Sequence, residues 1–197
     1  MRIWTIQPAE LYERLRAKKV LFADGRRYDR DRVWVFSYRW MADQMHSRLP
    51  PSKAQFPWWG WYRWLGKKRA KPDLRAGGHL PKGRRGVRLE LDMDERGVLL
   101  SDFSRWHAVL NNSFLAYDEA EDDDFRRKEN GTQFTLSGAR TRHLQSKVIA
   151  SWDRIFDLRR LDSDWWGRTS QMAIQATFWE LRLTDVRNVT FYTDRGR

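Results

Sequence analysis

Hydrophobic and polar positions alternate most strictly over residues 87–94 of the sequence. Charged residues there separate four apolar ones, which are Val87, Leu89, Leu91 and Met93. Successive side chains of a β-strand point to opposite faces, so this pattern predicts a strand with one buried face. The apolar run at residues 98–100 predicts a further short strand.

The N-terminal part of the chain predicts the order strand, helix, strand, helix. Residues 1–7 and 20–22 have the composition of short strands. Pro8 suits the first turn of a helix, and the apolar residues after it follow at helical spacing, at Leu11, Tyr12 and Leu15. A second apolar stripe over residues 33–49, stopped by two consecutive prolines, predicts the second helix.

Residues 56–64 form an aromatic run that contains four tryptophans. The run is too short and too aromatic for a helix, and it predicts a strand in which Gly60 allows a bulge or the close approach of a neighbour. Residues 66–85 are rich in glycine, proline and basic side chains. We expect them to form a loop, here called the basic loop.

The second half of the chain predicts two helices, an acidic insertion and the closing strands. Ser101 or Asp102 is placed to cap a helix that continues to residue 110. Residues 117–131 hold six acidic side chains in the run 118–124, and we expect a solvated, mobile insertion there. The remaining predictions are a helix over 141–152, a Trp-rich turn over 165–167, and strands over 174–183 and 189–192.

Together these elements predict an α+β fold in a single domain over residues 1–197, with a mixed or antiparallel sheet and about four helices. The sequence has no cysteine, so it offers no disulfide, thiolate nucleophile or Cys-based metal site. No segment approaches the roughly 18 consecutive apolar residues of a membrane helix, and the N-terminus lacks a signal-peptide pattern. We therefore expect a cytoplasmic protein without membrane contact.

The formal net charge of +12 favours a polyanionic partner such as nucleic acid. Between residues 60 and 90, ten Lys and Arg stand against two acidic residues, next to the aromatic run. Single-stranded nucleic acid binds to such combinations of cations and flat aromatic side chains. The candidate nucleic-acid-binding residues are Arg63, Lys67, Lys68, Arg69, Arg75, Arg84 and Arg85. The alternatives are a basic surface that serves only solubility and tryptophans that belong to the core.

Most catalytic signatures are missing from the sequence. It has no phosphate-binding Gly-Lys-Ser/Thr loop, no dinucleotide-binding glycine motif and no nucleophile elbow. The four histidines are far apart, and none has a second ligand four residues on, so no metal site is predicted. Ser101, Asp102 and His107 hold the chemical parts of a hydrolase, but a helix cap explains the first two better.

Glu180 is the candidate catalytic residue of the closing strand, together with Gln175. In a continuous strand, Glu180 faces away from Gln175, Thr177, Trp179 and Leu181. A glutamate that faces a pocket would have a raised pKa and would suit a general-base or ribose-binding role. The alternative is a surface ion pair between Glu180 and Arg182.

Short segments spread along the chain carry a family resemblance. They are residues 3–7 (IWTIQ), 40–41 (WM), 44–45 (QM), 61–64 (WYRW), 71–75 (KPDLR), 99–103 (LLSDF), 106–107 (WH), 110–111 (LN), 151–156 (SWDRIF) and 175–181 (QATFWEL). Together they resemble the bacterial domain-of-unknown-function 3841 family and span nearly the whole chain. That family has no settled activity, so the resemblance implies no catalytic residue.

The order of the elements is similar to that of ADP-ribosyltransferase folds. This similarity implies a nicotinamide-nucleotide pocket lined by Thr5, Gln7 and Trp61, with NAD as the cofactor. Gln175 or Glu180 would then orient the ribose hydroxyls and stabilise a cationic transition state. The chain departs from that pattern because it has no clear Glu-x-Glu and no His or Arg at the usual end of the first strand.

Three functional hypotheses stay open from the sequence. The first is a nucleotide-handling, ADP-ribosyltransferase-like enzyme. The second is a nucleic-acid-binding or adaptor module that uses the basic, Trp-rich stretch over residues 58–88. The third is a structural or partner-binding protein, in which the acidic run at 118–124 meets a basic partner.

Overall fold

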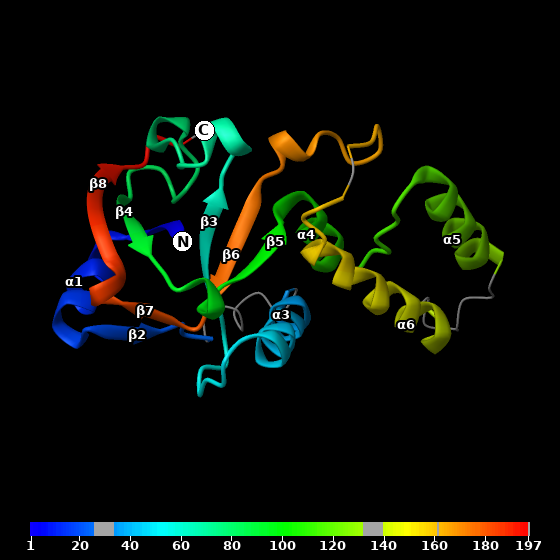
Figure 1. The fold of residues 1–197 in the computed structure, drawn as a ribbon, viewed down its shortest axis with the longest axis horizontal. Coiled ribbons are helices and arrows are strands. Elements are labelled where there is room, and N and C mark those ends of the chain that lie inside the picture. Colours follow the sequence, from blue (N-terminus) through cyan, green and yellow to red (C-terminus); the bar gives the residue numbers. More distant parts are fainter. Residues whose placement is uncertain (26–33, 132–139, 161, 197) are drawn as a thin grey trace. The chain divides into compact units, whose positions relative to one another are not determined.

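The computed structural model describes residues 1–25, 34–131, 140–160 and 162–196. Its contacts group the chain into two compact units (Figure 1). Unit 1 comprises Met1–Leu100 and Ala173–Arg197, and unit 2 comprises Ser101–Met172. The single domain expected over residues 1–197 stays a prediction, and each unit is described by itself.

Six strands form the main sheet, in the order β5-β6-β3-β1-β4-β8. Neighbouring strands from β6 to β8 pair antiparallel, and helices accompany the sheet, so the predicted α+β class is confirmed. The strands are β1 (Arg2–Pro8), β3 (Trp58–Arg63), β4 (Arg85–Asp92), β5 (Leu99–Asp102), β6 (Ile174–Phe178) and β8 (Val186–Thr193).

A second, two-stranded sheet joins β2 (Val20–Phe22) to β7 (Glu180–Arg182) and lies within unit 1. Helix α1 (Ala9–Lys18) buries Leu11 and Leu15 in the same core cluster as Leu21 and Leu181 of this small sheet. Helix α3 (Val35–Arg48) buries its apolar stripe at Trp40, Met41 and Met45. The first position of the predicted stripe, Val33, lies outside the described residues.

The alternation over residues 87–94 gives the buried face that it predicts. Val87, Leu89 and Leu91 of β4 are fully buried in the core cluster with Ile3 of the adjacent β1. The close approach expected at Gly60 is also confirmed, since a Cβ atom there would lie 2.6 Å from Ile3 Cγ2. Gly60 therefore lets β3 and the core side chains of β1 fit together.

The closing strand differs from its prediction. Residues 174–183 do not form one strand, because β6 ends at Phe178 in the main sheet and β7 begins at Glu180 in the small one. Phe178 and Trp179 are consecutive and both buried, so the predicted two-faced alternation is wrong at this point. The break comes from the change of sheet, which turns the chain between the two strands.

Unit 2 contains three α-helices within its described residues: α4 (Phe103–Leu110), α5 (Glu119–Gly131) and α6 (Arg142–Ser151). Asp102 caps α4 by accepting from the amides of Ser104 and Arg105, as predicted. Thr141 caps α6 in the same way through the amide of Leu144. Among the described residues, no helix is long and apolar enough to cross a membrane.

Helix α5 coincides with the acidic run, for which no helix was predicted. Ion pairs at i, i+4 spacing, such as Asp122 with Arg126, stabilise a helix even where the sequence is highly charged. Phe125 supplies the apolar contact, because its ring is buried and stacks on Phe114 with centroids 4.2 Å apart. One aromatic position in an acidic segment is a weak sequence signal.

Candidate functional site

Thr5 and Gln7, two of the predicted nucleotide-binding residues, lie on the core face of β1. Thr5 pairs with Leu89 of β4 and is 1% exposed. Its hydroxyl donates to the Trp59 carbonyl at 2.8 Å and accepts from Gln7 Nε2 at 2.9 Å. The first hydrogen bond joins β1 to β3 and the second lies within β1, so the Thr5 hydroxyl has a structural role.

Trp61, the third predicted nucleotide-binding residue, lies on the opposite face of the sheet. It pairs with Trp4 of β1, whose side chain alternates with that of Thr5. Gln175 pairs with Trp61 from β6, so these two residues share a face. The Gln175 Oε1 atom is buried and has no hydrogen-bond partner among the described residues. The structure thus brings Trp61 and Gln175 together and separates both from Thr5 and Gln7.

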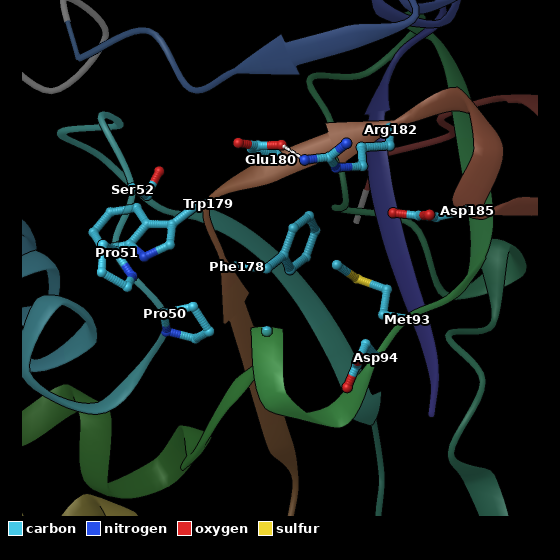
Figure 2. A pocket seen from close by; sticks show the side chains of 11 residues that line it. Pro50, Pro51, Ser52, Met93, Asp94, Phe178, Trp179, Glu180, Arg182 and Asp185 are labelled. Atoms are coloured by element: carbon cyan, nitrogen blue, oxygen red, sulfur yellow. Dashed lines mark ion pairs between the residues drawn. The ribbon is translucent and has the colours of Figure 1, made fainter.

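Glu180, the predicted catalytic residue, lines a pocket where β6 ends and β7 begins (Figure 2). Its carboxylate forms an ion pair with Arg182, and its side chain is 26% exposed. This geometry agrees with the surface ion pair that the sequence left as an alternative. Gln175 does not line this pocket, so the two predicted catalytic side chains do not converge there.

The pocket around Glu180, here called the Trp179 pocket, has a volume of about 320 Å³. Its apolar walls come from three parts of unit 1: Pro50, Pro51, Met93, Phe178 and Trp179. Its polar side chains, here called the polar edge, include Asp94, Glu180, Arg182 and Asp185. In Figure 2, Met93 lies beside Asp94 and Asp185, whereas the prolines and Trp179 lie on the other side of Phe178. The walls are therefore apolar and mostly flat, and the polar edge has three carboxylates for one guanidinium.

Trp179 contributes both an aromatic wall and a donor to the pocket. Its side chain is 6% exposed, and the exposed ring of His46 from α3 lies against it with centroids 4.4 Å apart. The Trp179 Nε1 atom is buried and has no hydrogen-bond partner among the described residues. A buried N–H without an acceptor costs free energy, so an acceptor from a ligand would stabilise it.

The three carboxylates of the pocket differ in their environment. Hydrogen bonds from Arg96 lower the pKa of Asp94 to about 2. Burial raises the pKa of Asp185 above its ordinary value, and it outweighs the hydrogen bond from Thr184 and the charge of Arg182, which lower that pKa. Asp185 accepts a hydrogen bond from the Thr184 hydroxyl at 3.3 Å. It has no cationic partner at ion-pair distance in the described part of the chain.

Asp194, a residue without a predicted role, holds the basic loop in place. Its two carboxylate oxygens accept four backbone N–H groups at 2.8–3.0 Å, from Gly78, His79, Leu80 and Gly196. These amides hold the pKa of Asp194 below its ordinary value. The Asp194 backbone also bonds to residues 83 and 84. In Figure 1 the basic loop accordingly lies beside the C-terminal end of the chain.

Further contacts fix the loop to the sheet. The His79 ring lies against Trp64 and bonds through Nε2 to the Asp73 carbonyl at 3.0 Å. Arg88 of β4 donates to the Pro72 carbonyl at 2.7 Å. Two short 3₁₀ helices, Lys67–Arg69 and Leu74–Ala76, complete the loop. The loop therefore has a defined conformation with its anchoring groups turned toward the sheet.

The seven predicted nucleic-acid-binding cations fall into two groups. Arg75 binds Asp73, and Arg84 pairs with Glu10. Among the described residues, the other five have no carboxylate at ion-pair distance: Arg63, Lys67, Lys68, Arg69 and Arg85. Arg63 lies over the Tyr62 ring, and Arg85 lies over the exposed ring of Phe191.

Asp102 has a structural role and does not take part in the hydrolase arrangement considered above. Its Oδ1 caps α4, and its Oδ2 lies 3.2 Å from Arg160 and 3.8 Å from Arg105. His107 Nδ1 bonds to the Phe103 carbonyl of its own helix at 3.0 Å. Ser101 Oγ is buried and has no partner in the described part of the chain. No Ser-His-Asp relay forms from these residues.

Two buried arginines around Asp102 were not found from the sequence. Arg105 is 1% exposed, donates to the Arg154 carbonyl and lies over the Trp166 ring. Burial and the charge of Arg160 lower the pKa of Arg105. Arginine is usually exposed, so the sequence did not predict that Arg105 is buried. The only feature of this cluster that the sequence predicted is the helix cap at Asp102. Among the described residues, no three His, Cys, Asp or Glu side chains gather to hold a metal ion.

Comparison with known proteins gives one match. The model of the family described as "Domain of unknown function (DUF3841)" matches residues 2–187. The search of curated proteins and the search of solved structures found no significant match. The matched range includes parts of both units and every predicted site residue.

Proposed function

Because the chain belongs to the DUF3841 family, whose description carries no activity, we propose a function from the geometry: unit 1 binds single-stranded nucleic acid through the basic loop. The observation that carries this proposal is a group of exposed cations on an anchored loop. Phosphate groups are the natural partners of such cations, and neutralising them releases counterions.

Lys67, Lys68 and Arg69 form the centre of the proposed surface. All three are exposed, and none has a carboxylate at ion-pair distance within the described residues. A cation that is already paired within the protein gains less from a phosphate, so Arg75 and Arg84 are the weaker candidates. The proposed phosphate contacts therefore centre on the first 3₁₀ helix of the loop.

Aromatic and apolar side chains border these cations. Trp64 and Tyr62 are half-buried, and Leu65 is largely exposed. Bases of a single strand stack on aromatic faces, and each stacked base contributes about 1–3 kcal/mol. Duplex DNA keeps its bases stacked inside, so it gains the phosphate contacts and not the stacking. We therefore expect a preference for single strands.

The anchoring of the loop supports binding because it reduces the entropy lost when the complex forms. A loop held by the Asp194 carboxylate and by Arg88 is already ordered before a ligand arrives. Binding then does not have to order the backbone that presents the cations. A run of charges that serves only solubility would not need such an ordered backbone, so the anchoring favours a binding role for the basic loop.

The test is fluorescence anisotropy with a labelled oligo-dT of about 20 nucleotides, which spans more than one typical single-strand site. The variant Lys67→Ala/Lys68→Ala/Arg69→Ala should weaken binding. If the three side chains each contact a phosphate, the slope of log K against log salt should become shallower by about 2.

A matched control separates local contacts from net charge. The variant Arg14→Ala/Arg16→Ala/Lys18→Ala removes the same charge from the exposed side of α1 and should bind nearly as the wild type does. Equal loss in both triple variants, or binding that does not respond to salt, would contradict the proposal.

The nucleotide-handling hypothesis keeps one supporting observation, the position of Glu180 in the Trp179 pocket. Its other predicted residues lie on two faces of the main sheet. A cytoplasmic location belongs with the nucleic-acid proposal, because that compartment gives access to RNA and, in cells without a nucleus, to DNA.

A further inference from the structure

The Trp179 pocket is independent of the basic loop, since none of its lining residues belongs to residues 66–85. Its volume of about 320 Å³ is at the lower end of the roughly 300–1,000 Å³ typical of small-molecule sites. Proline rings, an indole and a thioether form its walls. Such walls fit a flat ring that is buried by stacking and dispersion contacts.

The charges at the polar edge indicate which charge a ligand of this pocket would carry. Asp94 is engaged by Arg96, and Glu180 by Arg182. Asp185 accepts a hydrogen bond from the Thr184 hydroxyl and shares the charge of Arg182 with Glu180, but among the described residues it has no cation of its own at ion-pair distance. The pocket thus lacks one cation, in a protein whose overall charge is +12. A ligand that brings a positive charge would supply the missing partner.

Trp179 Nε1 indicates a second property of the ligand, a hydrogen-bond acceptor. This buried donor has no acceptor among the described residues, although its ring lines the pocket. A ligand with a carbonyl or ring-nitrogen acceptor would satisfy it. The ligand therefore needs a positive charge for Asp185 and an acceptor for the indole N–H.

We propose that the Trp179 pocket binds a small, flat, cationic nitrogen heterocycle that carries a hydrogen-bond acceptor. The ring lies against the accessible apolar surface of the proline pair and Met93, and its charged nitrogen faces Asp185. N-alkylated pyridinium carboxamides belong to this chemical class. This site is separate from the proposed nucleic-acid surface, so either can fail without the other.

The experiment compares 1-methylnicotinamide with nicotinamide by isothermal titration calorimetry. The two compounds share ring and carboxamide, and only the first is a cation. We expect the cation to bind about tenfold more tightly, as a charge-assisted contact implies. The variant Asp185→Asn should remove most of this preference. Trp179→Phe removes the indole N–H together with part of the aromatic wall, and it should weaken both compounds several-fold without changing the preference for the cation.

The control is Glu13→Gln on α1, which removes an exposed carboxylate outside the pocket and should leave both affinities unchanged. If Asp185→Asn does not fold, Glu180→Gln serves as the second variant. It leaves Arg182 unpaired at the polar edge and should also lower affinity for the cation. Equal binding of the two compounds, or a preference that survives both variants, would overturn the proposal.

Discussion

Two aspartates show how the same residue type can hold different parts of this protein. Asp194 accepts backbone N–H groups and fixes a loop, whereas Asp102 combines a helix cap with two buried arginines. Both are 1% exposed. A carboxylate is an unusual buried residue, so neither burial was predicted from the sequence, and only the helix cap at Asp102 was.

Replacing Asp194 with Asn should release the basic loop. One carboxylate oxygen becomes an amide NH₂ group that cannot accept the Leu80 and His79 amides. We expect faster hydrogen exchange at residues 78–80 by NMR and weaker binding of oligo-dT. Unchanged exchange at these amides would show that Asp194 does not hold the loop.

The stabilisation by Asp194 has a defined pH dependence. Its folded-state pKa is lowered from the ordinary 3.8, so the unfolded state binds its proton more readily. The contribution is fully present above pH 3.8 and is lost as the pH falls through the lowered value. The protection factors of the amides at residues 78–80, which compare their exchange with that of an unfolded peptide at the same pH, should therefore fall in acid for the wild type, and Asp194→Asn should show less of this dependence.

Replacing Asp102 with Asn should destabilise unit 2. Breaking a buried ion pair by removing one partner costs about 3–5 kcal/mol, because Arg105 and Arg160 would keep their charge in a buried site. Urea denaturation measures this loss. Asp94→Asn, which breaks an exposed pair with Arg96, is the control and should change the midpoint little. Similar effects of the two variants would refute the proposed role of the buried pair.

At the scale of elements, the spacing of hydrophobic residues predicted the helices and strands that bury one face. The helix at Leu11 and Leu15 and the strand at Leu89 follow from repeats of the hydrophobic pattern. The break after Phe178 could not be predicted this way, because an alternating pattern does not say which sheet a strand joins. The same limit applies to the faces of Thr5 and Trp61, which depend on the pairing of distant strands.

Replacing Gly60 with Ala tests the close contact between β3 and β1. The new Cβ would lie 2.6 Å from Ile3 Cγ2 and 3.0 Å from the Trp4 carbonyl oxygen. Overpacking of this kind costs about 1–3 kcal/mol, which a urea titration would detect. The control is Gly97→Ala, where a Cβ meets nothing within 4 Å. A Gly60→Ala protein as stable as the control would mean that Ile3 has room to move.

At the scale of the whole molecule, the basic surplus belongs to one unit. Unit 1 has 27 Lys and Arg against 14 Asp and Glu, and unit 2 has 11 against 12. A solubility role alone does not explain why the charge is confined in this way. The overall basic surplus was visible in the composition, but the boundary between the two units came from the structure.

The contacts that we propose for unit 1 are to phosphates and to the faces of bases, and these are shared by all sequences. Oligo-dA and oligo-dT of equal length should therefore bind within a few-fold of each other at the same salt concentration. Competition measurements in one buffer would check this. A preference of a hundredfold for one base would require contacts to base edges that the basic loop does not explain.

The bond between Gly78 and Asp194 joins residues 116 positions apart in the sequence. A contact between residues so far apart in the sequence closes a large loop of unfolded chain. The entropy lost in closing that loop delays the formation of the contact during folding. The basic loop can thus reach its final conformation only after β4 and β8 have paired. During refolding, burial of tryptophan should precede the recovery of oligonucleotide binding, so a partly folded chain would be compact before it could hold nucleic acid.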